Sequence, residues 1–188
     1  MKNLRFNLSR MLLVFAFGLI PYYSLAQDVK PSKQEKKELD KLALNANFNA
    51  IDTLLDRKTF VLEADYLQDR FGNRVPVMST VNFIKVESPK AVLQTGSSFS
   101  PGTNGLGGVT AEGVIENFKV VKNLKKLSYT VSFTIMTNIG IYDILMNIYS
   151  DTNATATISG ISGERLSWDG HFKNLYDSRF FQGQETIR

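Results

Sequence analysis

The chain has 188 residues, contains no cysteine, and carries 22 basic residues against 18 acidic ones. The absence of cysteine excludes disulfide bonds, thiol catalysis and thiolate metal sites. Three of the basic residues lie among the first 26, which hold no acid. The rest of the chain is therefore close to neutral, and its charge gives no indication of binding to nucleic acid or to an anionic membrane.

The N-terminus has the layout of a secretory signal peptide. Three basic residues precede the apolar run Met11–Ile20, and the small-x-small sequence Ser24-Leu25-Ala26 follows. The apolar run has half the length that a membrane-spanning helix needs. We therefore expect cleavage after Ala26. The mature chain, which has no membrane span, should then reside in the periplasm or outside the cell.

Residues 27–57 predict an N-terminal helical segment. Ser32 is followed three residues later by Glu35, which is the spacing of a capping box, and two apolar stripes follow at helical spacing. We expect a helix from about Lys33 to Leu55, bent near its asparagines, that packs on a sheet or covers an open end. A helix that binds a partner protein is the alternative.

Residues 58–188 carry eight to ten short strand patterns. The clearest is Leu127–Ile135, in which apolar residues alternate strictly with serine and threonine. Pro76 favours an edge or a bulge for its strand. Ile141–Tyr149 is apolar on both faces apart from Asp143 and Asn147, so it should be more buried than its neighbours. The expected strands are 59–67, 74–78, 80–86, 90–94, 114–121, 127–135, 141–149, 154–159, 166–172 and 178–182.

The number and spacing of these strands predict a mainly β fold. The four strands between Leu127 and Phe172 have short connections, so they should form an antiparallel meander. An up-and-down β-barrel closed by the N-terminal helix is the fold that this pattern favours. A two-sheet β-sandwich is the alternative.

Several of these patterns resemble a known family. They are residues 60–65 (FVLEAD), the Gly-Gly ahead of Ala111-Glu112-Gly113, and the later Tyr142-Asp143 and 154–159 (ATATIS). They are similar to exported bacterial proteins known only as domain of unknown function 4251, over about residues 55–172. The resemblance implies a lipocalin-like β-barrel behind a signal peptide, and it implies no activity because none is assigned to the family.

The stretch Gly96–Gly113 holds six of the thirteen glycines. It lacks the Lys-Ser/Thr pair of a phosphate-binding P-loop, and Thr110 stands where a dinucleotide fingerprint needs its last glycine. We expect a mobile loop at the barrel rim whose glycines serve chain geometry. A gate or contact surface for a ligand is the alternative, and Asn104 is its candidate ligand-binding residue.

The sequence contains no catalytic constellation that we recognise. His171 is the only histidine and should share a polar strand face with Asp169, but no nucleophile-elbow pattern surrounds the serines at 97, 98 and 100. A single histidine in a chain without cysteine cannot make a typical zinc site. We therefore predict a protein that is not an enzyme and has no catalytic residues, no metal and no cofactor.

Three acidic residues lie on expected strands. Glu63 and Asp65 share one strand face, where acids are mostly solvated. Asp143 lies in a strand that is otherwise apolar, and it would need a basic partner if it were buried. Three arginines are open as that partner: Arg74, Arg165 and Arg179.

The expected barrel interior gives the best indication of function. An eight-stranded barrel is either filled by its side chains or holds one small ligand. Ala154 and Ala156 are small beside large neighbours, which produces either interlocking or a pocket, and native packing density favours interlocking. We nevertheless predict binding of a small apolar or amphipathic molecule, with Tyr129, Phe133 and Trp168 as contacts.

Two other classes of function remain as alternatives. The first is a structural or protein-interaction module of the cell envelope, in which the glycine-rich stretch, the helix or an open sheet edge contacts an envelope protein. The second is an enzyme such as a hydrolase, which would need His171 to meet a serine and an acid at hydrogen-bond distance.

Overall fold

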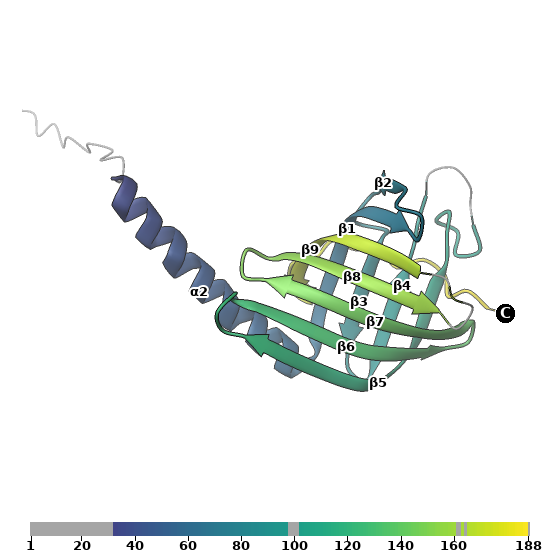
Figure 1. Ribbon diagram of the computed structural model, residues 1–188. Helices are drawn as coiled ribbons and strands as arrows, with labels where there is room; N and C mark the ends of the chain where they lie inside the picture. Colours follow the sequence, from purple (N-terminus) through teal and green to yellow (C-terminus); the bar gives the residue numbers. More distant parts are fainter. Residues whose placement is uncertain (1–31, 98–101, 161–162, 164, 188) are drawn as a thin grey trace, which may run out of the picture. The chain divides into compact units, whose positions relative to one another are not determined.

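The computed structural model describes residues 32–97, 102–160, 163 and 165–187 (Figure 1). The predicted signal peptide, residues 1–26, lies outside this part of the chain. The chain divides into two units, Met1–Lys36 and Lys37–Arg188, and the second holds the β-strands and most of the helix. No helix in the described portion has the length and apolarity needed to cross a membrane.

Helix α2 (Lys33–Arg57) begins with the predicted capping box. The Ser32 backbone N–H donates to Oε2 of Glu35 at 2.7 Å, and the Glu35 N–H donates to Oγ of Ser32 at 3.2 Å. Only the C-terminal half of the helix is buried, through Phe48, Ile51 and Leu55. These three residues share one helix face, and they join the hydrophobic core of the β-sheet.

Nine strands and a short 3₁₀ helix follow in the described residues. They are β1 (Thr59–Asp69), β2 (Arg74–Pro76), β3 (Phe83–Glu87), β4 (Lys90–Gln94), β5 (Thr110–Asn123), β6 (Ser128–Thr137), β7 (Gly140–Tyr149), β8 (Asn153–Gly160), β9 (Arg165–Asn174) and η1 (Leu175–Asp177).

Eight of the strands close into an antiparallel barrel. Their order is β1-β3-β4-β5-β6-β7-β8-β9, and β9 pairs back with β1. The up-and-down barrel is therefore confirmed, and the sandwich is excluded because a single sheet closes on itself. Strand β2 pairs only with the end of β1, where Pro76 stands opposite Tyr66. Pro76 thus lies on an edge strand, as its missing N–H favours.

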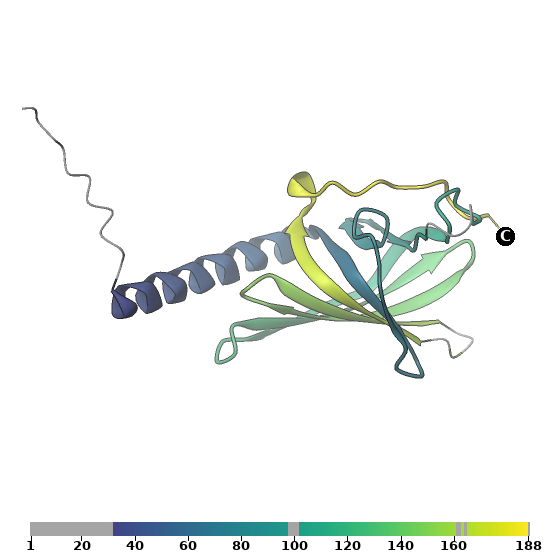
Figure 2. The same cartoon turned by 90° about the horizontal axis from the view of Figure 1, so that it is seen from above.

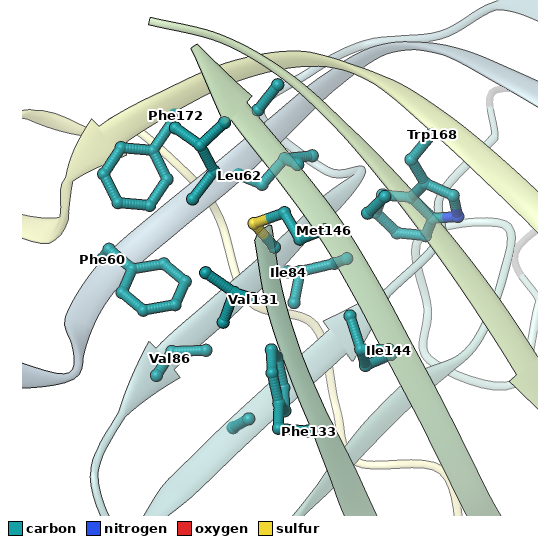
Figure 3. Packing of buried hydrophobic residues seen from close by; sticks show 14 of the residues in the cluster. Phe60, Leu62, Ile84, Val86, Val131, Phe133, Ile144, Met146, Trp168 and Phe172 are labelled. Carbon is teal, nitrogen blue, oxygen red and sulfur yellow. The ribbon is translucent and has the colours of Figure 1, made fainter. Parts of the chain in front are cut away.

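The hydrophobic core fills the inside of the barrel. Inward-facing residues alternate with outward-facing ones, as on β6, where Tyr129, Val131, Phe133 and Ile135 are buried. Figure 3 shows side chains from opposite walls, such as Ile84 of β3 and Met146 of β7, pointing toward one another. The strict alternation of Leu127–Ile135 thus correctly predicts a strand with one buried face.

The prediction that Ile141–Tyr149 is more buried than the neighbouring strands is wrong. Strand β7 alternates like its neighbours, and the outward-facing Leu145 and Tyr149 are 48% and 43% exposed. A barrel strand has only one inner face, and no second layer covers the outside of β7. Asp143 also lies on this outer face and accepts a hydrogen bond from Oγ1 of Thr134 at 2.8 Å, so it needs no buried arginine.

The C-terminal segment is not the strand predicted at 178–182. Residues 178–187, here called the C-terminal strap, run extended across the outside of the barrel (Figure 2). They follow η1 and help to cover Val61, Phe83 and Val92 on the outer faces of β1, β3 and β4. The Gln94 side chain holds the strap: its Nε2 donates to the Phe181 carbonyl at 2.8 Å and its Oε1 accepts from Gly183 N–H at 2.7 Å.

Candidate functional site

A cavity of about 190 Å³, partly open to solvent, lies at one end of the barrel interior. Residues from β4, β5, β7, β8 and β9, together with two from the connection between β4 and β5, line it. None of the nine lining residues that the structure describes carries a charge. They are Leu93, Thr95, Val109, Ala111, Tyr142, Ile158, Gly160, Leu166 and Trp168.

Helix α2 and the cavity lie at opposite ends of the barrel. Near the C-terminal end of β5, Lys122 Nζ lies 2.6 Å from Oδ2 of Asp52 on the helix. Near the N-terminal end of the same strand, Ala111 lines the cavity. One end of the barrel interior is thus filled by helix side chains, whereas the other end retains open space.

Two small residues create this space. Ala111 pairs with Leu93 across β5 and β4, and Gly160 pairs with Tyr142 across β8 and β7. A Cβ atom added to Gly160 would meet the Tyr142 ring at 3.7 Å, an ordinary van der Waals contact. A larger side chain would therefore be accommodated at Gly160, so close backbone packing does not require glycine there.

Ala154 and Ala156, the small residues noted in the sequence, lie elsewhere. Both are buried, and neither is among the residues that line the cavity. Ala156 stands between Met146 of β7 and Trp168 of β9, where small and large side chains interlock. The open space lies further along the same strand, at Gly160.

Trp168 is the predicted ligand contact that lines the cavity. Its side chain is 0% exposed, yet its indole Nε1–H has no hydrogen-bond partner. No other buried side-chain nitrogen or oxygen in the described residues lacks one. Figure 3 shows this nitrogen on the edge of the ring that is turned away from Met146 and Phe172.

Tyr129 and Phe133, the other two aromatic residues predicted as contacts, do not line the cavity. Tyr129 lies at the helix end, where its hydroxyl donates to the Phe48 carbonyl at 3.1 Å and its ring stacks on that of Phe48. Burial, together with the nearby Asp52 carboxylate, raises the pKa of Tyr129 to about 12. The Phe133 ring packs on Phe118, with ring centroids 5.6 Å apart.

Asn104 organises the connection between β4 and β5. It is 1% exposed. Its Nδ2 donates to the Thr95 carbonyl at 2.9 Å and to Oγ1 of Thr110 at 3.1 Å. Its Oδ1 accepts from the backbone N–H groups of Leu106 and Gly108 at 2.9 and 3.0 Å. These four bonds use both donors and both lone pairs of the amide, so Asn104 shapes the wall beside the cavity.

The glycines of this connection serve chain geometry, as expected. Gly102, Gly105 and Gly107 have φ angles of 58°, 74° and 79°, which residues with a side chain adopt at a cost. At Gly108 a Cβ atom would lie 2.3 Å from the Thr95 carbonyl oxygen. The glycine pattern therefore reflects tight turns and close backbone contacts.

On the outer face of the barrel, His171 and Asp169 pair with different partners and not with each other. His171 Nε2 lies 3.3 Å from Oδ2 of Asp65. Asp169, predicted on the same strand face, pairs with Arg74 at 3.0 Å instead. These four side chains are all substantially exposed. Within the described residues no group of three acidic or histidine side chains is placed to hold a metal ion.

The prediction that Glu63 is solvated is wrong, because the residue is 4% exposed. Lys173 Nζ lies 2.6 Å from its Oε2, and the Ser178 hydroxyl donates to its Oε1. Burial by itself raises the pKa of Glu63, but the hydrogen bonds from Lys173 and Ser178 outweigh burial and hold that pKa below its ordinary value. The C-terminal segment contributes to the burial of Glu63 and provides the bond from Ser178. The periodicity of the sequence did not predict where this segment lies.

Comparison with known proteins identifies the family. The family model described as "Domain of unknown function (DUF4251)" matches residues 43–172. A similar solved structure is a DUF4251 family protein from Bacteroides eggerthii DSM 20697, at 28% sequence identity and a TM-score of 0.59. The alignment covers 71% of this chain and 91% of that chain. Among curated proteins none matches. The family match confirms the resemblance seen in the sequence, and this chain belongs to the DUF4251 family.

Proposed function

We propose that this protein is an exported, non-enzymatic β-barrel that binds one small apolar or amphipathic molecule in the cavity beside Trp168. The observation that carries the proposal is the uneven filling of the barrel. Helix α2 fills one end with Phe48, Ile51 and Leu55, whereas the other end keeps an uncharged cavity lined mainly by apolar residues. The signal-peptide layout of residues 1–26 supports export.

The size of the cavity sets the size of the ligand. A dry apolar cavity of about 150 Å³ is enough to bind benzene, and this cavity measures about 190 Å³. It therefore suits a compact molecule of roughly seven to ten non-hydrogen atoms, by comparison with that case. A charged group would lose its hydration here without gaining an ionic partner from the described lining residues.

Toluene is a suitable first probe. Trp168 is the only tryptophan in the chain and lines the cavity, so its fluorescence reports events there. We expect toluene to produce a saturable fluorescence change and to raise the melting temperature of the chain from residue 27 onward, because a ligand that binds only the folded state stabilises it.

A pair of variants localises the binding. Gly160→Leu places a side chain in the cavity and should abolish the toluene response. Leu145→Phe adds bulk on the exposed outer face of β7 and should leave the response intact. An equal response in wild type and Gly160→Leu, or no response in wild type at saturating toluene, would overturn the proposal. Native mass spectrometry of protein purified from its own periplasm then identifies the natural ligand.

A further inference from the structure

The polar groups of the cavity restrict the chemistry of its ligand, an inference that rests on the proposed function. The Trp168 Nε1–H is fully buried and unpartnered. A buried N–H group without an acceptor has lost its bond to water and gained nothing in exchange. Buried side-chain polar atoms are otherwise paired with protein groups throughout the described residues. An unpaired donor of this kind calls for an acceptor from outside the chain, which is either an ordered water or a ligand.

The barrel fixes the position of this N–H. Trp168 stands opposite Ala156 of β8 on one side and opposite Leu67 of β1 on the other. Its ring is therefore carried by a strand, β9, that is hydrogen-bonded to a neighbouring strand along both edges. Figure 3 shows the nitrogen on the ring edge turned away from Met146 and Phe172. Phe172 lies toward the helix, since it lines a groove together with Ile51 and Leu54. The backbone at Trp168 is thus fixed by pairing on both sides, and the full burial of the residue restricts its ring.

Thr95 adds a second donor at the cavity. Its Oγ1 accepts a hydrogen bond from the Val109 N–H at 3.2 Å, and a hydroxyl group that accepts one bond can also donate one. No carboxylate, ammonium or guanidinium group belongs to the described lining. The site therefore offers hydrogen-bond donors in apolar surroundings, a combination that favours a neutral acceptor over an ion.

We infer that the cavity takes a small neutral molecule with an oxygen acceptor, such as a ketone, aldehyde or ester. The oxygen accepts from Trp168 Nε1–H, and the apolar body packs on Leu93, Ile158 and Leu166. A hydrocarbon of the same size leaves the N–H unpaired. A carboxylic acid or an amine in its ionised form loses its hydration without gaining an ion pair.

Acetophenone and isopropylbenzene test this inference as a matched pair. They have the same number of non-hydrogen atoms and nearly the same shape, and only acetophenone carries an acceptor. We expect acetophenone to bind about two- to thirteenfold more tightly, the range that one additional hydrogen bond gives. Titration is followed by ¹H–¹⁵N NMR, in which the single indole N–H resonance should move downfield with acetophenone alone.

Two further comparisons sharpen the test. In Trp168→Phe the preference for acetophenone should disappear while isopropylbenzene still binds. Benzoate at pH 7 should bind at least about tenfold more weakly than acetophenone, because its charge is desolvated. The indole resonance of wild type gives the same answer should the variant fail to fold.

The outcomes separate this inference from the proposed function. Equal affinity of wild type for the two neutral probes, or benzoate binding as tight as that of acetophenone, would overturn the inference and leave the proposed function standing. Binding of neither neutral probe would overturn both. A preference for acetophenone that persists in Trp168→Phe would show that another group provides the donor, and would overturn the assignment to Trp168.

Discussion

Glu63 is a buried carboxylate on the outside of a barrel, where side chains normally face water. The C-terminal strap and η1 cover this part of β1, and they bring Ser178 to one carboxylate oxygen while Lys173 of β9 reaches the other. Breaking such a pair leaves a buried group unsatisfied. Glu63 therefore joins the strap, β1 and β9 through a single side chain.

We predict that Glu63→Gln lowers the unfolding free energy by about 1–3 kcal/mol at pH 7, because a charged hydrogen-bonded pair is lost. The folded-state pKa of Glu63 lies below its ordinary value of 4.5. The carboxylate thus adds stability above the unfolded-state pKa, and this stability is lost as the pH falls through the folded-state pKa. Urea denaturation should show the difference between wild type and variant shrinking below about pH 4.5.

An exposed glutamate provides the control for this prediction. Glu116 lies on β5 and is exposed to solvent, so Glu116→Gln should change the unfolding free energy by less than about 0.5 kcal/mol throughout the pH range. A Glu63→Gln effect that stays constant from pH 7 down to pH 3 would contradict a role for the ionised carboxylate.

The sequence predicted the inward-facing residues better than the buried polar ones. Trp168 could be placed inside the barrel because period-two alternation alone decides which strand face is buried. The burial of Glu63 and Asn104 depends on contacts that no local pattern contains. Glu63 bonds to Ser178, 115 positions later, and the backbone carbonyl of Asn104 accepts from the Gln184 N–H. The alternation of apolar and polar residues also could not predict the cavity, because it gives the direction of a side chain but not the space beside it.

Only one of the two predicted apolar stripes of helix α2 packs against the barrel. Phe48, Ile51 and Leu55 are buried against the core, whereas Leu42, in the first predicted stripe, is 66% exposed. The ring of Phe48 stacks on Tyr129, whose hydroxyl also bonds to the Phe48 carbonyl. The barrel end thus contacts the helix at Phe48 through both ring stacking and a hydrogen bond, and it also packs against Ile51 and Leu55 in the last turns.

We predict a large difference between two leucine-to-alanine variants in this helix. Leu55→Ala should lower the unfolding free energy by about 2–4 kcal/mol, because it leaves a cavity among buried side chains. Leu42→Ala should change it by less than about 0.5 kcal/mol, since an exposed leucine loses no burial and alanine favours a helix. Chemical denaturation followed by circular dichroism measures both. Equal effects would show that the helix is held by more than its C-terminal half.

Strand and helix positions followed from the sequence wherever one face of an element is buried. The capping box at Ser32 and Glu35, the strand at Leu127–Ile135 and the edge position of Pro76 are each set by local chemistry. Two expectations about 141–149 and 178–182 were wrong for the same reason. Apolar residues on the outside of the barrel are covered at Val61, Phe83 and Val92 and left open at Leu145, and only the path of the strap decides between these cases.

Closure of the barrel requires close approach of the first and last strands. Glu63 of β1 stands opposite His171 of β9, and the register shifts between Ala64 and Tyr66. Gly170 lies beside this irregularity, where a Cβ atom would be 1.9 Å from the Glu63 carbonyl oxygen. The absence of a side chain at Gly170 is therefore a condition for the two strands to pair in this register.

We predict that Gly170→Ala lowers the unfolding free energy by more than about 3 kcal/mol, because the new methyl group overlaps a backbone oxygen that cannot move without breaking the seam. Gly160→Ala is the matched control, since its Cβ meets the Tyr142 ring at 3.7 Å, and it should lie within about 1 kcal/mol of wild type. Thermal melts by circular dichroism compare the two. Similar melting temperatures for both variants would show that the seam tolerates a shift in register.

The pairing of β1 with β9 also affects when the chain can fold. The first strand to be synthesised pairs with the last one, and the strap that covers β1 is synthesised later still. Long sequence separation between contacting residues slows folding. A newly made chain therefore remains open until nearly all of it is available. An unfolded chain is the form that passes through a membrane channel, so late closure of the barrel is compatible with the export that we propose.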